Sequence, residues 1–275
     1  MSSTTLTSRP TEAHAPATRD DVTPVRVLTS EWIKLRTLRS SWYTLAAAVV
    51  AMIAIGLVIG YATSTSNWAS LDAEDTVASA PLQGYHLSEL LIGVLGVLFV
   101  SGEYATGMIR STFAAVPKRL PILGAKSAVF GVVALVTMTA TSFATFFAAQ
   151  AFLSPDGHGS SLSDPGALRS VAGVGLYLAL IGLLGGAFGW IVRSTAGAIS
   201  GLVGLLLIVP VILGLLPGSI GTTIAKFFPS NAGGSLVSSV QLPDTLAPWT
   251  GIGVLGLWVV AALALAAVVI RRRDA

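Results

Sequence analysis

The chain has 275 residues, of which 53% are hydrophobic and only 11% are charged, and its mean hydropathy is +0.78. Soluble domains carry roughly a quarter of charged residues, so this composition excludes a water-soluble protein and predicts a membrane protein. The net charge of +3 comes from residues that cluster at the ends of apolar runs, which indicates topology signals rather than a nucleic-acid surface. Because there is no cysteine, disulfides, thiolate nucleophiles and thiolate metal sites are excluded.

The first segment, residues 1–22, is rich in Ser, Thr, Pro and charge and contains no apolar run of the kind found in secretory signals. It is predicted to be a disordered cytoplasmic tail.

Residues 23–41 are predicted to form an amphipathic helix, in which Thr23 is the N-cap and Pro24 takes the first helical position. Apolar residues recur at three- and four-residue spacing, at Val25, Leu28, Trp32, Leu35 and Leu38. Such a helix should lie along the inner membrane surface with its basic residues toward anionic headgroups. The interfacial residues would be Trp32, Lys34, Arg36 and Arg39. The alternative is a positively charged anchor without an ordered helix.

Six further segments have the roughly 20 mostly apolar residues that a spanning helix needs. They cover residues 42–61, 82–100, 127–152, 171–192, 196–216 and 248–270, so residues 42–270 are predicted to form one transmembrane domain. Pro210 should kink the fifth span. Small residues in "GLLGGAFG" (182–189) and "GAISG" (197–201) predict close packing of the fourth span on the fifth. The alternative is that these glycines have no packing role, because glycine is common in spanning helices.

The loop charges predict the orientation, because loops rich in Lys and Arg stay in the cytoplasm. With both termini inside, only Arg169 and Lys226 among the basic loop residues fall outside, and the basic C-terminus, 271–275, is cytoplasmic. The outer loops carry acids instead, namely Asp72, Glu74, Asp75, Asp156, Asp164 and Asp244. The prediction is therefore an all-α integral membrane protein with six transmembrane helices and both termini in the cytoplasm.

The connection between the second and third spans is unusually polar and reads "SGEYATGMIRSTFAAVPKRLPILGAK" (101–126). Ile109 and Phe113 fall on one helical face, and Pro117 should end the helix. This pattern predicts a short cytoplasmic helix whose Ile109 and Phe113 are free to insert into a groove on a partner. A solvated loop is the alternative.

Ionisable side chains inside a span are costly and become functional candidates, and the clear cases are His86 and Glu89. Their i, i+3 spacing places them on one helix face near the outer end of the second span, where they either line a translocation path or pair with each other at the headgroups. Other buried acids or bases are expected to be nearly absent. The hydroxyl and amide side chains of the third span should be satisfied by hydrogen bonding within or between helices.

No enzymatic function is expected, because no H-E-x-x-H or G-x-S-x-G motif occurs and there are only three histidines, His14, His86 and His158, without ligand spacing. No G-x-x-x-x-G-K-[ST] motif occurs either, so the chain has no phosphate loop of its own for ATP.

Six motifs together resemble the type-2 permease subunits of ATP-binding-cassette transporters. They are "SEWIKLRTLRSSWYTL" (30–45), "GEYATGMIRSTFAAVPKRL" (102–120), "RSTAGAISG" (193–201), "FFPSNAGG" (227–234), "LAPWTG" (246–251) and the terminal "RRRDA" (271–275). The resemblance covers nearly all of the chain after the tail.

This resemblance implies that residues 23–41 form an interfacial connecting helix and that the 101–126 connection forms a coupling helix on a separate ATPase subunit. The implied coupling residues are Glu103, Tyr104, Gly107, Ile109, Arg110, Phe113, Pro117 and Arg119. Glu103 is expected to pair with a cation or to cap the coupling helix.

It also implies a bacterial inner membrane location and a second permease copy as partner, with membrane lipid around the pair and no nucleic acid. The chain itself holds no cofactor, because ATP and Mg²⁺ bind the ATPase. The function implied is an ATP-driven permease that exports a lipid-like or hydrophobic compound. The alternative function is a secondary transporter or channel that works without an ATPase.

Overall fold

The computed structural model describes residues 23–65, 79–154, 159–216, 219–239 and 244–272, and these residues form helices and no strand. The elements are α1 (Pro24–Thr37), α2 (Arg39–Thr65), η2 (Ala80–Gly84), α3 (Tyr85–Ala105), α4 (Met108–Ala115), α5 (Leu120–Leu153), α6 (Ala167–Val192), α7 (Thr195–Val203), η3 (Gly204–Ile208), α8 (Val209–Gly214), α9 (Ser219–Ala225), α10 (Pro229–Val237) and α11 (Pro248–Arg272).

Six helical stretches are long and apolar enough to cross a membrane, namely α2, η2 with α3, α5, α6, α7 through α8, and α11. The prediction of an all-helical protein with six such segments is confirmed, and the composition and helices together support a multi-pass membrane protein. The predicted tail, 1–22, lies outside the described residues, as do His14, Asp72, Glu74, Asp75, Asp156 and His158.

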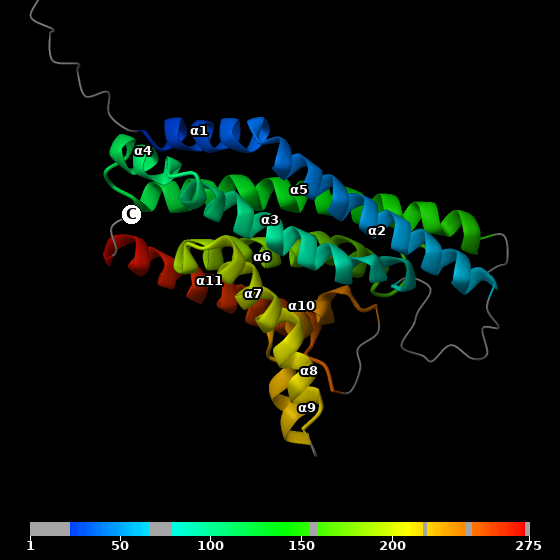
Figure 1. Ribbon diagram of the computed structural model, residues 1–275. Coiled ribbons are helices and arrows are strands. Elements are labelled where there is room, and N and C mark those ends of the chain that lie inside the picture. Colours follow the sequence, from blue (N-terminus) through cyan, green and yellow to red (C-terminus); the bar gives the residue numbers. More distant parts are fainter. Residues whose placement is uncertain (1–22, 66–78, 155–158, 217–218, 240–243, 273–275) are drawn as a thin grey trace, which may run out of the picture.

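The bundle is built around α3 and α6 (Figure 1). In the most apolar 18-residue stretch of each of these two spans, 67% of the residues are buried inside the protein, compared with 28% or less in the other four spans. α5 and α11 pack on α6, whereas α2 packs on α3 and α5. The core therefore lies along α3 and α6, and the remaining spans turn much of their apolar surface outward, as expected for helices that face lipid.

Glycines bring α3 and α6 together at backbone contact. A Cβ atom on Gly96 of α3 would overlap the carbonyl group of Gly182, and one on Gly185 of α6 would overlap the carbonyl group of Gly93. The prediction of close packing between the fourth and fifth spans is therefore wrong for Gly185 and Gly189 of "GLLGGAFG", which face the second span. It is confirmed for "GAISG", because Gly201 of α7 lies against the Phe188 ring of α6. Spacing showed which residues share a face, but it did not show which neighbour that face meets.

The fifth span is interrupted where Pro210 was expected to kink it. Its first part, α7, passes into the π-helical segment η3 and then into α8, and Figure 1 shows the axis turning between α7 and α8. Proline has no amide hydrogen for the carbonyl group four residues earlier, which is that of Leu206. Ser230 at the start of α10 donates its hydroxyl hydrogen to this carbonyl oxygen at 2.8 Å. The kink is confirmed, and the released carbonyl group has a partner.

The first helix begins as predicted, with the Thr23 hydroxyl accepting the Arg26 amide hydrogen at 3.4 Å and Pro24 in the first position. Its buried face consists of Val27, Glu31 and Leu35. The predicted apolar stripe is thus split between two faces, because Leu35 packs inward whereas Val25, Leu28, Trp32 and Leu38 are exposed. The position of this exposed face in a membrane surface stays a prediction.

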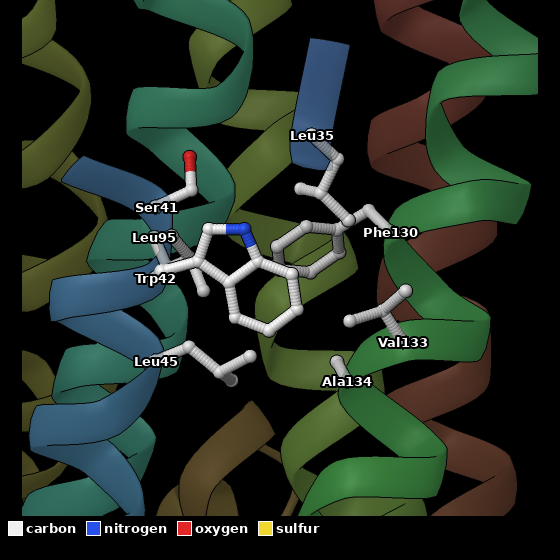
Figure 2. A pocket seen from close by; sticks show the side chains of 8 residues that line it. All are labelled: Leu35, Ser41, Trp42, Leu45, Leu95, Phe130, Val133 and Ala134. Atoms are coloured by element: carbon white, nitrogen blue, oxygen red, sulfur yellow. The ribbon is translucent and has the colours of Figure 1, made fainter. Parts of the chain in front are cut away.

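Trp42 holds the corner between α1 and α2. Its indole nitrogen donates a hydrogen bond to the Arg36 carbonyl oxygen at 3.0 Å. Figure 2 shows the ring of Trp42 between Leu35 of α1, Leu45 of α2 and Phe130 of α5, around a small apolar cavity. These contacts of Trp42 help to hold α1 against α5, with which α1 packs.

The pairing of Ser230 with Pro210 predicts a thermodynamic coupling between two helices. Ser230→Ala should lower the free energy of unfolding by about 1–3 kcal/mol, because a buried carbonyl group loses its partner. In a Pro210→Ala background the amide hydrogen returns, so the same serine substitution should cost much less. Apparent Tm values in detergent measure both effects, and Ser200→Ala on the exposed face of α7 is the control. Equal costs of Ser230→Ala in both backgrounds would contradict this assignment.

Candidate functional site

The short helix α4 follows α3 through a single turn at Gly107. This residue has φ of +72°, in the left-handed region that glycine adopts without strain. α4 ends at Ala115, two residues before Pro117, so the predicted short helix and its end are confirmed. α4, the start of α5 and the end of α11 lie at the same end of the bundle (Figure 1), which we call the α4 end.

A network of four charged side chains is buried at the α4 end. Glu31 and Lys34 come from α1, Glu103 comes from α3 and Lys126 comes from α5. Lys126 Nζ lies 2.8 Å from a carboxylate oxygen of Glu31 and 2.8 Å from one of Glu103. Lys34 Nζ lies 2.6 Å from Glu31 and 3.0 Å from Glu103. Two cations and two anions thus alternate, and the network is electrically neutral.

Burial makes this network costly to disturb. Glu31 and Lys126 are each 1% exposed and Glu103 is 6% exposed, whereas the Lys34 side chain is 22% exposed. Ions removed from water are stable only when they are paired, and an unpaired one costs several kcal/mol. The contact between Glu31 Oε2 and Lys126 is an ion pair without hydrogen-bond geometry. The Lys126 ammonium group also donates to the Phe99 carbonyl oxygen at 3.3 Å and lies 4.2 Å from the Phe99 ring centroid.

The network also reaches α4 through Thr112. Lys34 Nζ donates to the Thr112 hydroxyl at 3.3 Å. This hydroxyl donates to the Met108 carbonyl oxygen at 3.2 Å and also lies 3.5 Å from Glu103 Oε2. Ile109 and Phe113 pack beneath α4 in an apolar cluster with residues of α1, α3, α5, α6 and α11. α4 is therefore fixed to the bundle by both polar and apolar contacts.

Two sequence predictions about this region are wrong. Ile109 and Phe113 are 3% and 9% exposed, so they are not free to enter a groove on a partner. Lys34 does not face outward with the other basic residues of α1, because it points to Glu31 and Glu103. In both cases an amphipathic pattern was assigned to an outside surface, although the protein itself covers that face of the helix.

The other predicted residues divide into an inner and an outer group. Glu103 pairs with two cations, as expected, and it does not cap α4, whose N-cap is Gly107. The Tyr104 ring packs edge-on against Trp190, and Arg119 donates to the Ile270 carbonyl oxygen at 3.1 Å. The predicted coupling residues that are exposed are Gly107, Arg110 and Pro117. The predicted interfacial residues Trp32, Arg36 and Arg39 of residues 23–41 are exposed as well.

Sequence reasoning missed Glu31, and it assigned Lys126 only a topological role. The signal for Glu31 was its spacing, because it lies four residues from Val27 and four from Leu35 on the inward face of α1. A carboxylate in the middle of an apolar face needs a buried cation. The expectation that buried charges other than Glu89 are nearly absent is likewise wrong, since Glu31, Glu103 and Lys126 are all buried.

A second candidate site lies away from the α4 end, where His86 and Glu89 both line a cavity of about 610 Å³. The Tyr177 hydroxyl of α6 donates a hydrogen bond to the Glu89 carboxylate, so Glu89 is turned toward α6 and not toward His86. The His86 ring packs on that of Tyr85 with centroids 4.0 Å apart. The rest of the wall combines apolar residues of η3 and α8 with Ser230 and Asn231 of α10 and with the charged residues Lys226 and Asp244.

Hydroxyl groups of the third span donate to backbone carbonyl oxygens within and between helices, as predicted, whereas the Gln150 amide nitrogen is buried without a hydrogen-bond partner among the described residues. The Ser142 hydroxyl donates to the Val171 carbonyl oxygen of α6 at 2.7 Å. The hydroxyls of Thr141 and Thr145 donate to carbonyl oxygens one turn earlier on α5, and Gln150 accepts the Ser160 amide hydrogen. These residues therefore contribute to helix packing rather than to a site.

Neither a protein-family profile nor a curated protein matches this chain.

The buried network predicts a large effect of removing one charge. Lys126→Met leaves Glu31 and Glu103 facing Lys34 alone, so we expect a loss of about 3–5 kcal/mol in the free energy of unfolding. Adding Glu31→Gln restores the charge balance and should recover part of that loss. Apparent Tm in detergent reports both effects, and Arg36→Gln on the exposed face of α1 should stay within about 0.5 kcal/mol of the unsubstituted protein. If Lys126→Met is as stable as Arg36→Gln, the network does not stabilise the fold.

Because of Lys34, the stability that the network contributes should depend on pH in the alkaline range. Burial by itself lowers the pKa of Lys34, but its hydrogen bond to Glu31 and the charges of Glu103 and Glu31 outweigh this and raise the pKa above its ordinary value of 10.5. Lys34 therefore stabilises the folded state fully at pH values below the ordinary pKa. This stabilisation is lost as the pH rises through the pKa that Lys34 has in the folded protein. The Tm difference between the unsubstituted protein and Lys34→Met should thus be constant from pH 7 to about 9.5 and should shrink above about 10.5. A difference that already shrinks between pH 7 and 9 would refute this.

Proposed function

We propose that this chain is the membrane-spanning permease subunit of an ATP-binding-cassette transporter, and that a separate subunit binds ATP and Mg²⁺. The observation that carries the proposal is α4, a short helix between two spans whose inner face is locked to the bundle and whose outer face is exposed. The motif resemblance supports it, as does the absence of a phosphate loop from the sequence.

The network gives α4 the rigidity that a force-transmitting element needs. α4 is linked to α3 through Gly107 and the Thr112–Glu103 contact, to α1 through Lys34, and through Glu103 to Lys126 of α5. A push on α4 would therefore move the ends of three helices together rather than bend a loop. Two-state rigid-body motion of this kind couples sites that lie far apart.

The exposed face of α4 indicates the chemistry of the partner surface. It presents Met108, Arg110 and Ser111, and the exposed Lys118 follows α4. An apolar side chain with cations on the same surface fits an apolar groove with an acidic rim. We place the α4 end in the cytoplasm of a bacterial cell, since the basic residues Arg110, Lys118 and Arg271 gather there. A second permease copy and surrounding lipid complete the proposed assembly, which exports a lipid-like or hydrophobic compound.

One observation supports a second candidate function. Glu89 is a buried carboxylate that lines the cavity of about 610 Å³ between α3, α8 and α10. Secondary transporters use such intramembrane carboxylates to carry protons or cations. This candidate predicts uptake or export that follows an ion gradient, without ATP, and that fails in Glu89→Gln.

Purification of the tagged chain from its own host tests the proposal. An ATP-hydrolysing protein should co-purify, and Arg110→Glu should lower its yield about tenfold because the substitution reverses one charge on the contact face. Arg36→Glu is the matched control, since Arg36 is also exposed but lies on α1. Co-purification that is equal in both variants would refute α4 as the contact, and transport by the isolated chain without ATP would refute the proposal itself.

A further inference from the structure

A cavity of about 540 Å³ lies between the α4–α5 connection and the end of α11. Its walls are Pro117, Lys118, Arg119, Leu120, Pro121 and Arg271, so three of the six lining residues are cations and none is an acid. The end of α11 returns to the α4 end of the bundle, where α5 starts (Figure 1). Residues about 150 positions apart in the sequence thus face one opening.

The floor of this cavity is fixed in place. Arg119 donates through Nη1 to the carbonyl oxygen of Ile270, and its guanidinium group lies 5.0 Å from the ring centroid of Phe113. Leu120 and Pro121 belong to the first turn of α5, and the N-terminus of a helix carries a partial positive charge. Lys118 and Arg271 are exposed at the rim. An anion in the cavity would meet the exposed cations Lys118 and Arg271 and the end of a helix dipole.

The depth of the cavity in a membrane follows from the spans that border it. Leu120 is the first residue of the third span, and Arg271 is next to the last residue of the sixth. α5 has 34 residues and is therefore about 51 Å long, more than the roughly 40–45 Å of a bilayer with its headgroups, so its first turn lies at or just outside the headgroup level. This placement does not depend on which side of the membrane the α4 end occupies.

We infer that this cavity binds the phosphodiester headgroup of an anionic phospholipid. Basic pockets between the ends of spanning helices suit such headgroups, and the apolar walls formed by Pro117, Leu120 and Pro121 suit the adjoining glycerol and acyl chains. The volume lies in the range of small-molecule sites, roughly 300–1,000 Å³, and a single carboxylate side chain of a protein partner would leave most of it empty. The inference holds whether or not the chain works with an ATPase.

Lipid titration of the purified full-length protein tests the inference, with native mass spectrometry to count bound lipids. Phosphatidylglycerol should bind at least tenfold more tightly than phosphatidylcholine. The double substitution Lys118→Gln and Arg271→Gln should weaken phosphatidylglycerol binding about 25-fold, since each cation near a headgroup contributes about fivefold. Both residues are exposed, and Arg119 is left intact because it contacts Ile270, so the fold should be retained. Arg272→Gln is the matched control, since Arg272 neighbours Arg271 but does not line the cavity.

Three results would overturn the inference. Equal losses in Arg272→Gln and in the double variant would show diffuse attraction to the surface rather than a site. Occupation by inorganic phosphate with no preference for phosphatidylglycerol would show a site for free phosphate. Unchanged phosphatidylglycerol binding by the double variant, with loss of a co-purifying protein, would assign the cavity to a protein partner.

Discussion

The arrangement of the α4 end depends on the two cations and two anions that alternate between α1, α3 and α5. No one helix provides this charge balance, because α1 contributes a carboxylate and an ammonium group, α3 a carboxylate and α5 an ammonium group. Each buried ion is tolerable only while the others are in place, so the three helices are held in one relative position. α4 inherits that position through Thr112 and through the apolar side chains beneath it.

α3 connects this network with the cavity that contains Glu89. Glu103 and Glu89 are fourteen residues apart on the same helix, or about 21 Å along its axis. Each carboxylate contacts a different neighbour, Lys126 of α5 in one case and Tyr177 of α6 in the other. Glycines let α3 and α6 approach to backbone contact, so the two helices form a closely packed pair that links the two carboxylates.

The helix of the fifth span is less regular than α3 and α6. Pro210 and the π-helical segment weaken its regular hydrogen bonding, and the Ser230 hydroxyl replaces one of the lost bonds from outside the helix. α8 and the short helices α9 and α10 line the Glu89 cavity opposite α3. The cavity therefore has the continuous helix α3 on one side and short, interrupted helices on the other. The charged cavity below α4 is also shared between distant segments, since the end of the last span closes it.

The sequence by itself determined the six apolar helices, the capped first helix, the kink at Pro210 and the short helix between the second and third spans. These features follow from local rules of length, periodicity, capping and proline chemistry. Tertiary structure alone decided which faces are covered. Ile109, Phe113 and Lys34 turned out to face the protein, the glycines of α6 met α3, and Glu31 became the partner of Lys126. The physical reason is that an amphipathic pattern identifies a face, whereas its partner is set by contacts between residues far apart in the chain.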